Sequence, residues 1–213
     1  MTRGRFIAFE GGEGRGKSTQ AARLAEALEA RGLSVIRTRE PGGTPGAEII
    51  RRLLLEPPGE GWGPRAEALL FAAARSDHVE RLILPALERG AWVVCDRFVD
   101  SSRAYQGAAG GLGDDQVRAL HRIGSANLLP DLTILLQADN GTAKARLIER
   151  DGGDSDAIGG RLPAYHDTVA AAFDRFAKAE PERFVTIEGV GSVEDVHRNV
   201  WSAIAPLLED TGR

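Results

Sequence analysis

The sequence has a single cysteine, Cys95, among its 213 residues. A lone cysteine excludes an internal disulfide and is typical of a reducing compartment, so we expect a cytoplasmic protein. Long apolar runs are also missing, since none approaches the ~20 residues that a membrane-spanning helix needs. Residues 1–5 lead directly into a strand-like segment, which is unlike the start of a signal peptide. We therefore expect no membrane partner.

Lysine is scarce as well, with three lysines against 24 arginines among the 27 basic residues, and the formal net charge is −4. A negative chain is a poor general binder of nucleic acid, so we expect no nucleic-acid partner. Any contacts with phosphate should be local. One of the three lysines, Lys17, directly follows a run of glycines.

Short β-branched segments alternate with longer segments of helical period, which predicts an α/β fold with a parallel sheet and helices on both faces. Strands are expected at about residues 5–10, 34–39, 91–96, 131–137 and 183–188. Helices are expected at 18–30, 47–55, 66–89, 114–125, 142–149, 163–179 and 193–208. The length and the 42% hydrophobic content suit one domain over residues 1–213, with the polar, glycine-rich segment at about 150–162 as a mobile lid.

Residues 11–18 read GGEGRGKS and match the pattern G-x-x-x-x-G-K-[ST] between an expected strand and an expected helix. The glycines let backbone N–H groups converge on phosphates, Lys17 reaches the β and γ oxygens, and the Ser18 hydroxyl faces Mg²⁺. A glycine-rich turn without a ligand is the alternative, which the strand–helix context disfavours. The segment predicts a site for the ATP phosphates formed by Gly11, Gly12, Glu13, Gly14, Arg15, Gly16, Lys17, Ser18 and Thr19.

Motor proteins, GTPases, kinases and transporters all use such a loop, so the loop alone does not identify the phosphate acceptor. A chain of 213 residues is too short for a helicase or a transporter, and it has no N-K-x-D motif for reading guanine. The sequence therefore favours a kinase that acts on a small molecule.

Three further segments resemble the signature segments of thymidylate kinases in their order and spacing: TREPGGT at 38–44, LFAAAR at 70–75 and DRFVDSSRAYQG at 96–107. The segments PDLT at 130–133 and AEPERF at 179–184 are similar to bacterial members of that family. The resemblance implies a P-loop kinase with a five-stranded parallel sheet. It also implies a homodimer that uses ATP and Mg²⁺ to phosphorylate dTMP for dTTP synthesis.

Two arginines, Arg39 and Arg97, each follow an expected strand and so lie at the carboxyl edge of the sheet, where open α/β folds bind ligands. Together they can hold a monophosphate through paired hydrogen bonds, although either one alone would be interpreted as a surface residue. Asp96 ends its strand as a Mg²⁺-binding aspartate would, with a capping role as the alternative. The resemblance implies that Glu13 contacts the acceptor sugar or a metal-bound water. Catalytic roles are thus expected for Lys17, Arg97, Glu13 and Arg39, and metal contacts for Ser18 and Asp96.

Phe71 and Arg75 are four residues apart on an expected helix and share one of its faces. In an isolated pair of this kind, a packed ring and an exposed guanidinium would be the better interpretation. The resemblance implies instead that Phe71 stacks on thymine and that Arg75 bonds its carbonyl edge. Ser102 and Gln106 have the same spacing and are implied to contact the pyrimidine edge.

The acceptor pocket is implied to include two more residues. Tyr105 would lie under the sugar, where its ring leaves little room for a 2′-hydroxyl group. Pro41 would shape the pocket, through either a cis or a trans Glu40–Pro41 bond.

The lid departs from the bacterial relatives whose phosphate loop has glycine at the position of Gly14. Their lid typically carries D-R-[IF]-E, whereas residues 156–159 read DAIG here, so Ala157 stands where an arginine is expected. The transferred phosphoryl group still needs a further cation. We predict Arg161 for this catalytic role in preference to Arg15. Further candidates are Arg146 and Arg150.

Two other functions stay open at this point. One alternative to a dTMP kinase is a kinase for another or a modified deoxynucleoside monophosphate. The other is a weakly active paralogue that binds nucleotide.

Overall fold

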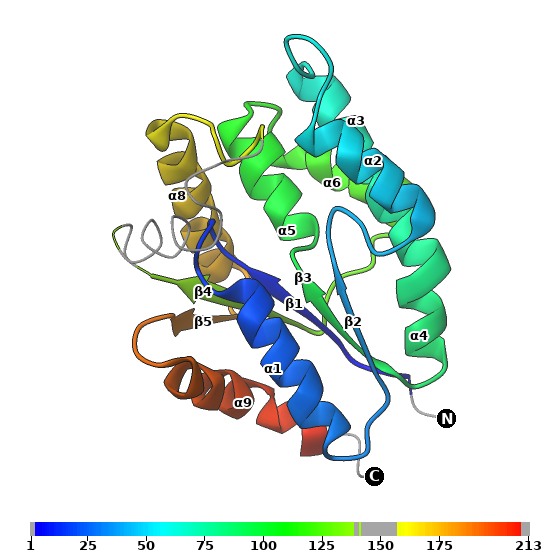
Figure 1. Ribbon diagram of the computed structural model, residues 1–213, viewed down its shortest axis with the longest axis vertical. Coiled ribbons are helices and arrows are strands. Elements are labelled where there is room, and N and C mark those ends of the chain that lie inside the picture. The colour runs from blue at the N-terminus through cyan, green and yellow to red at the C-terminus, as the bar shows by residue number, and fades with distance from the viewer. Residues whose placement is uncertain (1–2, 139–140, 142–156, 210–213) are drawn as a thin grey trace.

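The computed structural model describes residues 3–138, 141 and 157–209. Five parallel strands form one sheet in the order β2-β3-β1-β4-β5 (Figure 1). The strands are β1 (Phe6–Glu10), β2 (Val35–Arg39), β3 (Trp92–Asp96), β4 (Leu132–Gln137) and β5 (Phe184–Glu188). Each strand begins one residue later than predicted and ends where predicted, so the expected parallel sheet is confirmed.

The described helices agree with the predicted ones apart from one additional segment. They are α1 (Lys17–Glu29), α2 (Pro45–Leu55), α3 (Pro64–His78), the π-helix η1 (Val79–Ile83), α4 (Leu84–Glu88), α5 (Val99–Ser102), the π-helix η2 (Arg103–Ala109), α6 (Asp114–Ser125), α8 (Pro163–Ala179) and α9 (Val193–Glu209). The segment α5–η2 was not predicted. The helix predicted at 142–149 lies outside the described residues, as does the first part of the predicted lid, while residues 157–160 form turns.

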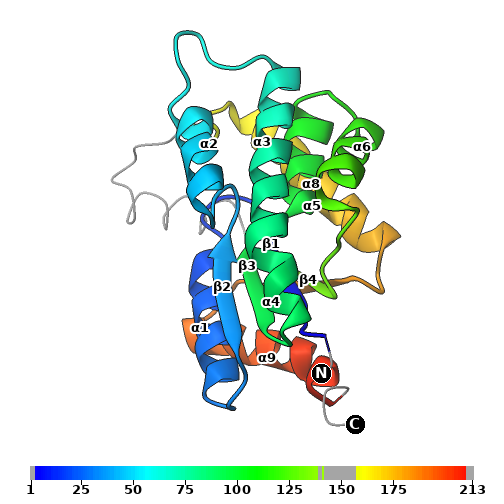
Figure 2. The same ribbon diagram turned by 90° about the vertical axis from the view of Figure 1, so that its right-hand side faces the viewer.

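Helices cover both faces of the sheet because its central strand is apolar on both sides. Along β1, Ile7 and Phe9 pack with α1 and α9, whereas Phe6 and Ala8 pack with η1 and α4. All four side chains are fully buried. Figures 1 and 2 show α1 and α9 on one side of the sheet and the longer helical layer with α2, α3, α6 and α8 on the other. No helix in the described part of the chain is both long and apolar enough to cross a membrane.

The carboxyl ends of three strands meet at one edge of the sheet. β1 leads into the glycine-rich loop, β2 ends at Arg39 beside Asp96 of β3, and Asp96 also lies beside Phe9 of β1. This edge is where ligands bind in open parallel sheets, so the fold brings the predicted functional segments together.

Candidate active site

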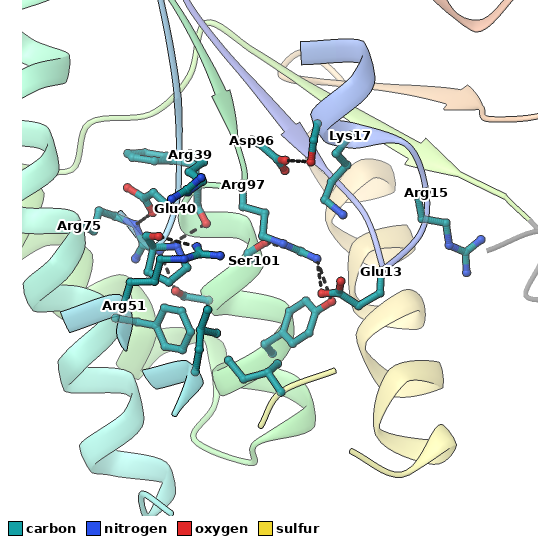
Figure 3. Close-up of a pocket in the computed structure, with 18 of the residues that line it drawn as sticks. Glu13, Arg15, Lys17, Arg39, Glu40, Arg51, Arg75, Asp96, Arg97 and Ser101 are labelled. Carbon is teal, nitrogen blue, oxygen red and sulfur yellow. Dashed lines mark hydrogen bonds and ion pairs between the residues drawn. The ribbon is translucent and has the colours of Figure 1, made fainter. Parts of the chain in front are cut away.

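A cavity of about 530 Å³ lies at this edge, between the glycine-rich loop and the helices α2, α3 and α5–η2 (Figure 3). The predicted site residues that line it are Glu13, Gly14, Arg15, Gly16, Lys17, Ser18, Thr19, Arg39, Pro41, Phe71, Arg75, Asp96, Arg97, Ser102, Tyr105 and Gln106. The predicted residues Gly11, Gly12 and Arg161 are not part of its lining.

The glycine-rich loop has the backbone shape that a phosphate cradle needs. Gly14 and Gly16 have φ angles of 68° and 88°, in the left-handed region that favours glycine. Lys17 begins α1, and its Nζ donates a hydrogen bond to the Gly12 carbonyl at 2.7 Å. Burial, reinforced by the nearby Arg97, lowers the pKa of Lys17 to about 8. The loop thus holds a desolvated cation next to the free N–H groups of a helix start.

Ser18 and Asp96 form the second polar group of the cavity. The Ser18 hydroxyl donates to Asp96 Oδ2, which joins the start of α1 to the end of β3. The other carboxylate oxygen, Asp96 Oδ1, is buried and has no hydrogen-bond partner within the described part of the chain. Buried polar oxygens are nearly always satisfied, so this oxygen fits a bound cation or a water on that cation.

Arg97 is the cation at the centre of the cavity. Its φ of 68° is unusual for a residue with a side chain and is typical of backbone held in place at functional sites. Its guanidinium donates to Glu13 Oε1 at 2.7 Å, to the Gly11 carbonyl at 3.0 Å and to Ser101 Oγ at 3.1 Å. It also lies 5.1 Å from the centroid of the Tyr105 ring. Arg97 is therefore aimed from β3 across to the phosphate loop, as Figure 3 shows.

Glu10, which was not predicted from the sequence, holds the turn that carries Arg97. This fully buried carboxylate accepts hydrogen bonds from Phe98 N at 2.8 Å, Ser101 N at 3.0 Å and Ser101 Oγ at 2.6 Å. Burial, with the nearby Asp100 charge, raises the pKa of Glu10 to about 7. A glutamate at the end of an otherwise apolar strand was the signal that could have revealed it.

The far end of the cavity contains a buried ion pair. Arg75 Nε donates to Glu40 Oε2 at 2.7 Å, and its Nη2 donates to Ser102 Oγ at 2.8 Å. Burial alone would raise the pKa of Glu40, but Arg75 and His78 outweigh it and hold that pKa below its ordinary value. The bond between Glu40 and Pro41 is cis. Arg75 and Ser102 are thereby fixed side by side, although they come from α3 and α5.

Apolar side chains and two more arginines complete the walls. Phe71 and Tyr105 line the cavity together with Leu55 and Ile158. Arg51, on α2, donates from Nη1 to the Pro41 carbonyl at 2.7 Å and was missed by the sequence argument. Arg39 lies at the rim, more than half exposed, where its Nη2 is 3.2 Å from Glu48 Oε1.

The two arginines considered as substitutes for the missing lid arginine lie in different places. Arg15 lines the cavity and extends from the phosphate loop away from the Arg97–Glu13 pair (Figure 3). Arg161 instead donates to Glu67 on α3 and to the Tyr165 hydroxyl. The catalytic role of Arg161 stays a prediction.

The residues thus form a phosphate loop joined by one cavity to a cation-rich centre and a partly aromatic far end. Comparison with known proteins shows the family. A family model described as thymidylate kinase matches residues 9–200. The chain belongs to the thymidylate kinase family.

Individual thymidylate kinases are similar to almost the whole chain. The chain is 58% identical over 205 residues to the thymidylate kinase of Rhizorhabdus wittichii. This alignment covers 96% of the present chain and 99% of that protein. It is 48% identical to the thymidylate kinase of Bradyrhizobium sp. strain ORS 278, over 97% of this chain and 92% of that one. Among solved structures, the thymidylate kinase of Ehrlichia chaffeensis matches with a TM-score of 0.78 and 30% identity, over 95% of this chain and 99% of its own.

The chain is therefore a phosphotransferase of the thymidylate kinase family with a P-loop kinase fold. The family identified from the three signature segments is confirmed.

Proposed function

We propose that this chain transfers the γ-phosphate of ATP to dTMP and so makes dTDP for dTTP synthesis. The observation that carries the proposal is one continuous cavity that runs from the phosphate loop to the Arg75–Ser102 pair and the Phe71 ring. In-line attack of a monophosphate oxygen on the γ-phosphorus needs donor and acceptor held end to end, and catalysis then rests on positioning and charge. A cavity with cations at its centre and aromatic and polar groups at its end suits a pyrimidine monophosphate.

A coupled assay of ADP release across dTMP, dUMP, dCMP, dGMP and dAMP tests this acceptor. We expect kcat/KM to be highest for dTMP. A higher value for another base would identify a kinase of different specificity. An absence of ADP release with all five, from a folded chain that still binds ATP, would identify a nucleotide-binding paralogue.

We assign the donor phosphates to residues 11–19, with Lys17 neutralising charge on the transferred group. Mg²⁺ would be held by Ser18 and Asp96, and the buried, unpartnered Asp96 Oδ1 supports this assignment. Mg²⁺ commonly takes one or two protein ligands and completes its shell with phosphates and waters. When bound, the ion neutralises the charge that develops on the phosphate oxygens.

We assign the acceptor phosphate to Arg97 and Arg39, the arginines that follow β3 and β2. Arg97 is supported by its aim across the cavity, and Arg39 by its place on the rim. We assign Glu13, which contacts Arg97, to the sugar or to a water on the metal. The Tyr105 ring, 5.1 Å from the Arg97 guanidinium carbon, limits the space beside the sugar and so favours a deoxyribose.

We assign thymine to the far end of the cavity. Phe71 offers a ring for stacking, and Arg75 offers donors for a carbonyl oxygen of the base. Ser102 and Gln106 would contact the remaining polar edge, with Pro41 as part of the wall. The hydrogen bond from Arg75 to Ser102, at 2.8 Å, supports a joint role because it fixes both groups before the base arrives.

The catalytic role predicted for Arg161 is untested, and we propose Arg15 in its place as the additional cation for the transferred phosphoryl group. Arg15 lines the cavity within the phosphate loop, whereas Arg161 is not part of the cavity lining. Charge near the γ-phosphate stabilises the transition state more than the bound substrate, so this role affects kcat more than KM.

We also propose that the chain acts as a homodimer in the cytoplasm. A homodimer is supported by an apolar groove between α3 and α6, which lie side by side in Figure 2. Two of its lining residues are exposed, Leu69 by 56% and Ile123 by 81%. Exposed apolar surface of this kind marks sites of protein association.

A further inference from the structure

Gln106, which we assign to the thymine edge, is held from behind by a carboxylate. Its Nε2 donates to Glu67 Oε1 at 2.9 Å, and both side chains are buried. Gln106 lines the cavity but Glu67 does not. The amide nitrogen is therefore directed toward a partner outside the cavity.

Glu67 is in turn paired with Arg161. Arg161 Nη2 donates to Glu67 Oε2, and Arg161 Nη1 donates to the Tyr165 hydroxyl. That hydroxyl donates to the carbonyl of Tyr105 at 2.8 Å, so the same cluster also holds the backbone next to Gln106. The two carboxylate oxygens of Glu67 thus accept from different donors, Oε2 from Arg161 and Oε1 from Gln106 Nε2, so Glu67 holds the amide with its nitrogen toward itself.

This orientation decides which atom Gln106 offers to a base. Its amide oxygen, the one acceptor atom of the side chain, accepts no hydrogen bond from any residue that the structure describes. Thymine and uracil carry a hydrogen on N3, whereas N3 of cytosine is an acceptor. An amide oxygen fits the first two bases and repels the third. An amide that could rotate by half a turn would fit both kinds.

We propose that Glu67 is a positioning residue that sets base selectivity by holding the Gln106 amide with its oxygen toward N3 of the base, and that Arg161 holds the Glu67 carboxylate in place for this purpose. The proposal rests on the proposed function, because it takes the base of dTMP to lie beside Gln106. It gives Arg161 a task at the base, in place of the phosphoryl group.

The test is Glu67→Gln, which keeps the shape of the side chain but lets it donate as well as accept. Selectivity is measured as the ratio of kcat/KM for dUMP to that for dCMP. Both nucleotides lack the 5-methyl group, and their bases differ only at N3 and at the neighbouring group on C4. We expect the ratio to fall by about tenfold, the equivalent of one well-placed hydrogen bond. An unchanged ratio in a cooperatively folded variant would overturn the proposal.

Two controls separate positioning from general damage. Glu80→Gln alters an exposed glutamate in η1, part of the same continuous helix, and should leave the ratio unchanged. Adding Glu67→Gln to Gln106→Ala should cause no further loss of selectivity, because Glu67 acts through the amide that is then missing. A full additional loss in the double variant would contradict the proposal.

Arg161→Met keeps the proposal testable if Glu67→Gln does not fold. A lower dUMP to dCMP ratio supports a role at the base. An equal fall in kcat for both nucleotides, with an unchanged ratio, overturns it and supports a role of Arg161 at the phosphoryl group.

The wild-type preference among monophosphates is measured first. If the wild type does not prefer dTMP, the proposed function fails, whereas a wild-type preference that Glu67→Gln leaves intact defeats only this inference.

Discussion

At the scale of the residue, Lys17 is the most consequential side chain, because the phosphate loop depends on its charge. Burial lowers its pKa to about 8 in the free protein, so Lys17 is charged below that pH and neutral above it. We expect kcat/KM for ATP, which reports the free enzyme, to fall as the pH rises through about 8. The fall in kcat should begin at higher pH, since bound phosphates favour the charged lysine.

A pH profile of both parameters, with circular dichroism over the same range as a control for folding, measures this effect. A kcat/KM for ATP that stays constant across pH 8 in a folded protein would show that Lys17 does not titrate there.

Phe71 provides the second prediction at this scale. Phe71→Ala removes the ring at the far end of the cavity, and base stacking on an aromatic residue contributes roughly 1–3 kcal/mol. We therefore expect the KM for dTMP to rise about tenfold, with little change in the KM for ATP. Steady-state kinetics with each substrate varied in turn measures both KM values. Equal increases in both KM values would point to a distorted site in place of lost stacking.

The sequence predicted most residues of the cavity but missed residues whose roles depend on contacts made only in the folded chain. Phe71, Arg75 and Arg97 lie in short segments with a recognisable pattern. Arg51 and Glu67, by contrast, look like ordinary charged residues of surface helices. Arg51 meets the Pro41 carbonyl only because the chain turns back before α2, and Glu67 meets Gln106 only because α3 packs against η2.

At the scale of the element, the segment α5–η2 is held in place by a buried charge cluster. Asp100 is fully buried and bonds Arg103 Nη1 at 2.7 Å and Arg183 Nη1 at 2.6 Å. Arg183 adjoins β5, so the cluster ties the segment that carries Ser102 and Gln106 to the edge strand of the sheet.

Asp100→Ala leaves two buried guanidinium groups short of a counter-charge. Removing one partner of a buried ion pair typically costs 3–5 kcal/mol, and we expect about 3 kcal/mol because Glu180 still contacts both arginines. Urea denaturation measures the free energy of unfolding. Asp167→Ala, at an exposed position of α8, is the matched control and should stay within ~0.5 kcal/mol of the wild type. Equal stability of the two variants would contradict a structural role for the cluster.

The five strands could be predicted because each is a short β-branched or apolar run bounded by turns. The segment α5–η2 could not. Its residues, VDSSRAYQGAA, include serines and a glycine and have no capping pattern. The segment is helical because Asp100 and Arg103 are paired and the Tyr105 ring packs in a core cluster. Tertiary contacts override weak local preference here.

The phosphate loop and the lid give the next prediction. If Arg15 stabilises the transferred phosphoryl group, Arg15→Ala lowers the single-turnover rate by ~10³-fold, the lower end of the range for arginines in this role. The KM values for ATP and dTMP should change little. Arg161→Ala serves as the comparison and should change the rate with dTMP only a few-fold. The reverse order of the two effects would restore Arg161 as the catalytic arginine.

At the scale of the whole molecule, the apolar groove between α3 and α6 predicts a dimer. Ile123→Glu adds a charge at its most exposed apolar position and should convert the dimer to a monomer. Val190→Glu, at an apolar residue that is 61% exposed elsewhere, is the matched control and should remain dimeric. Light scattering coupled to size-exclusion chromatography gives the mass. A wild type with the mass of a single chain, or two variants that behave alike, would contradict the proposed interface.

The central claim is that this phosphate loop and this cavity transfer phosphate from ATP to dTMP. The most direct measurement is the amount of dTDP and ADP formed from ATP, Mg²⁺ and dTMP, separated by anion-exchange chromatography. Our account predicts dTDP and ADP in equal amounts, and neither product above background from a folded Lys17→Ala variant. ADP without dTDP, or equal yields of dTDP from the wild type and Lys17→Ala, would contradict it.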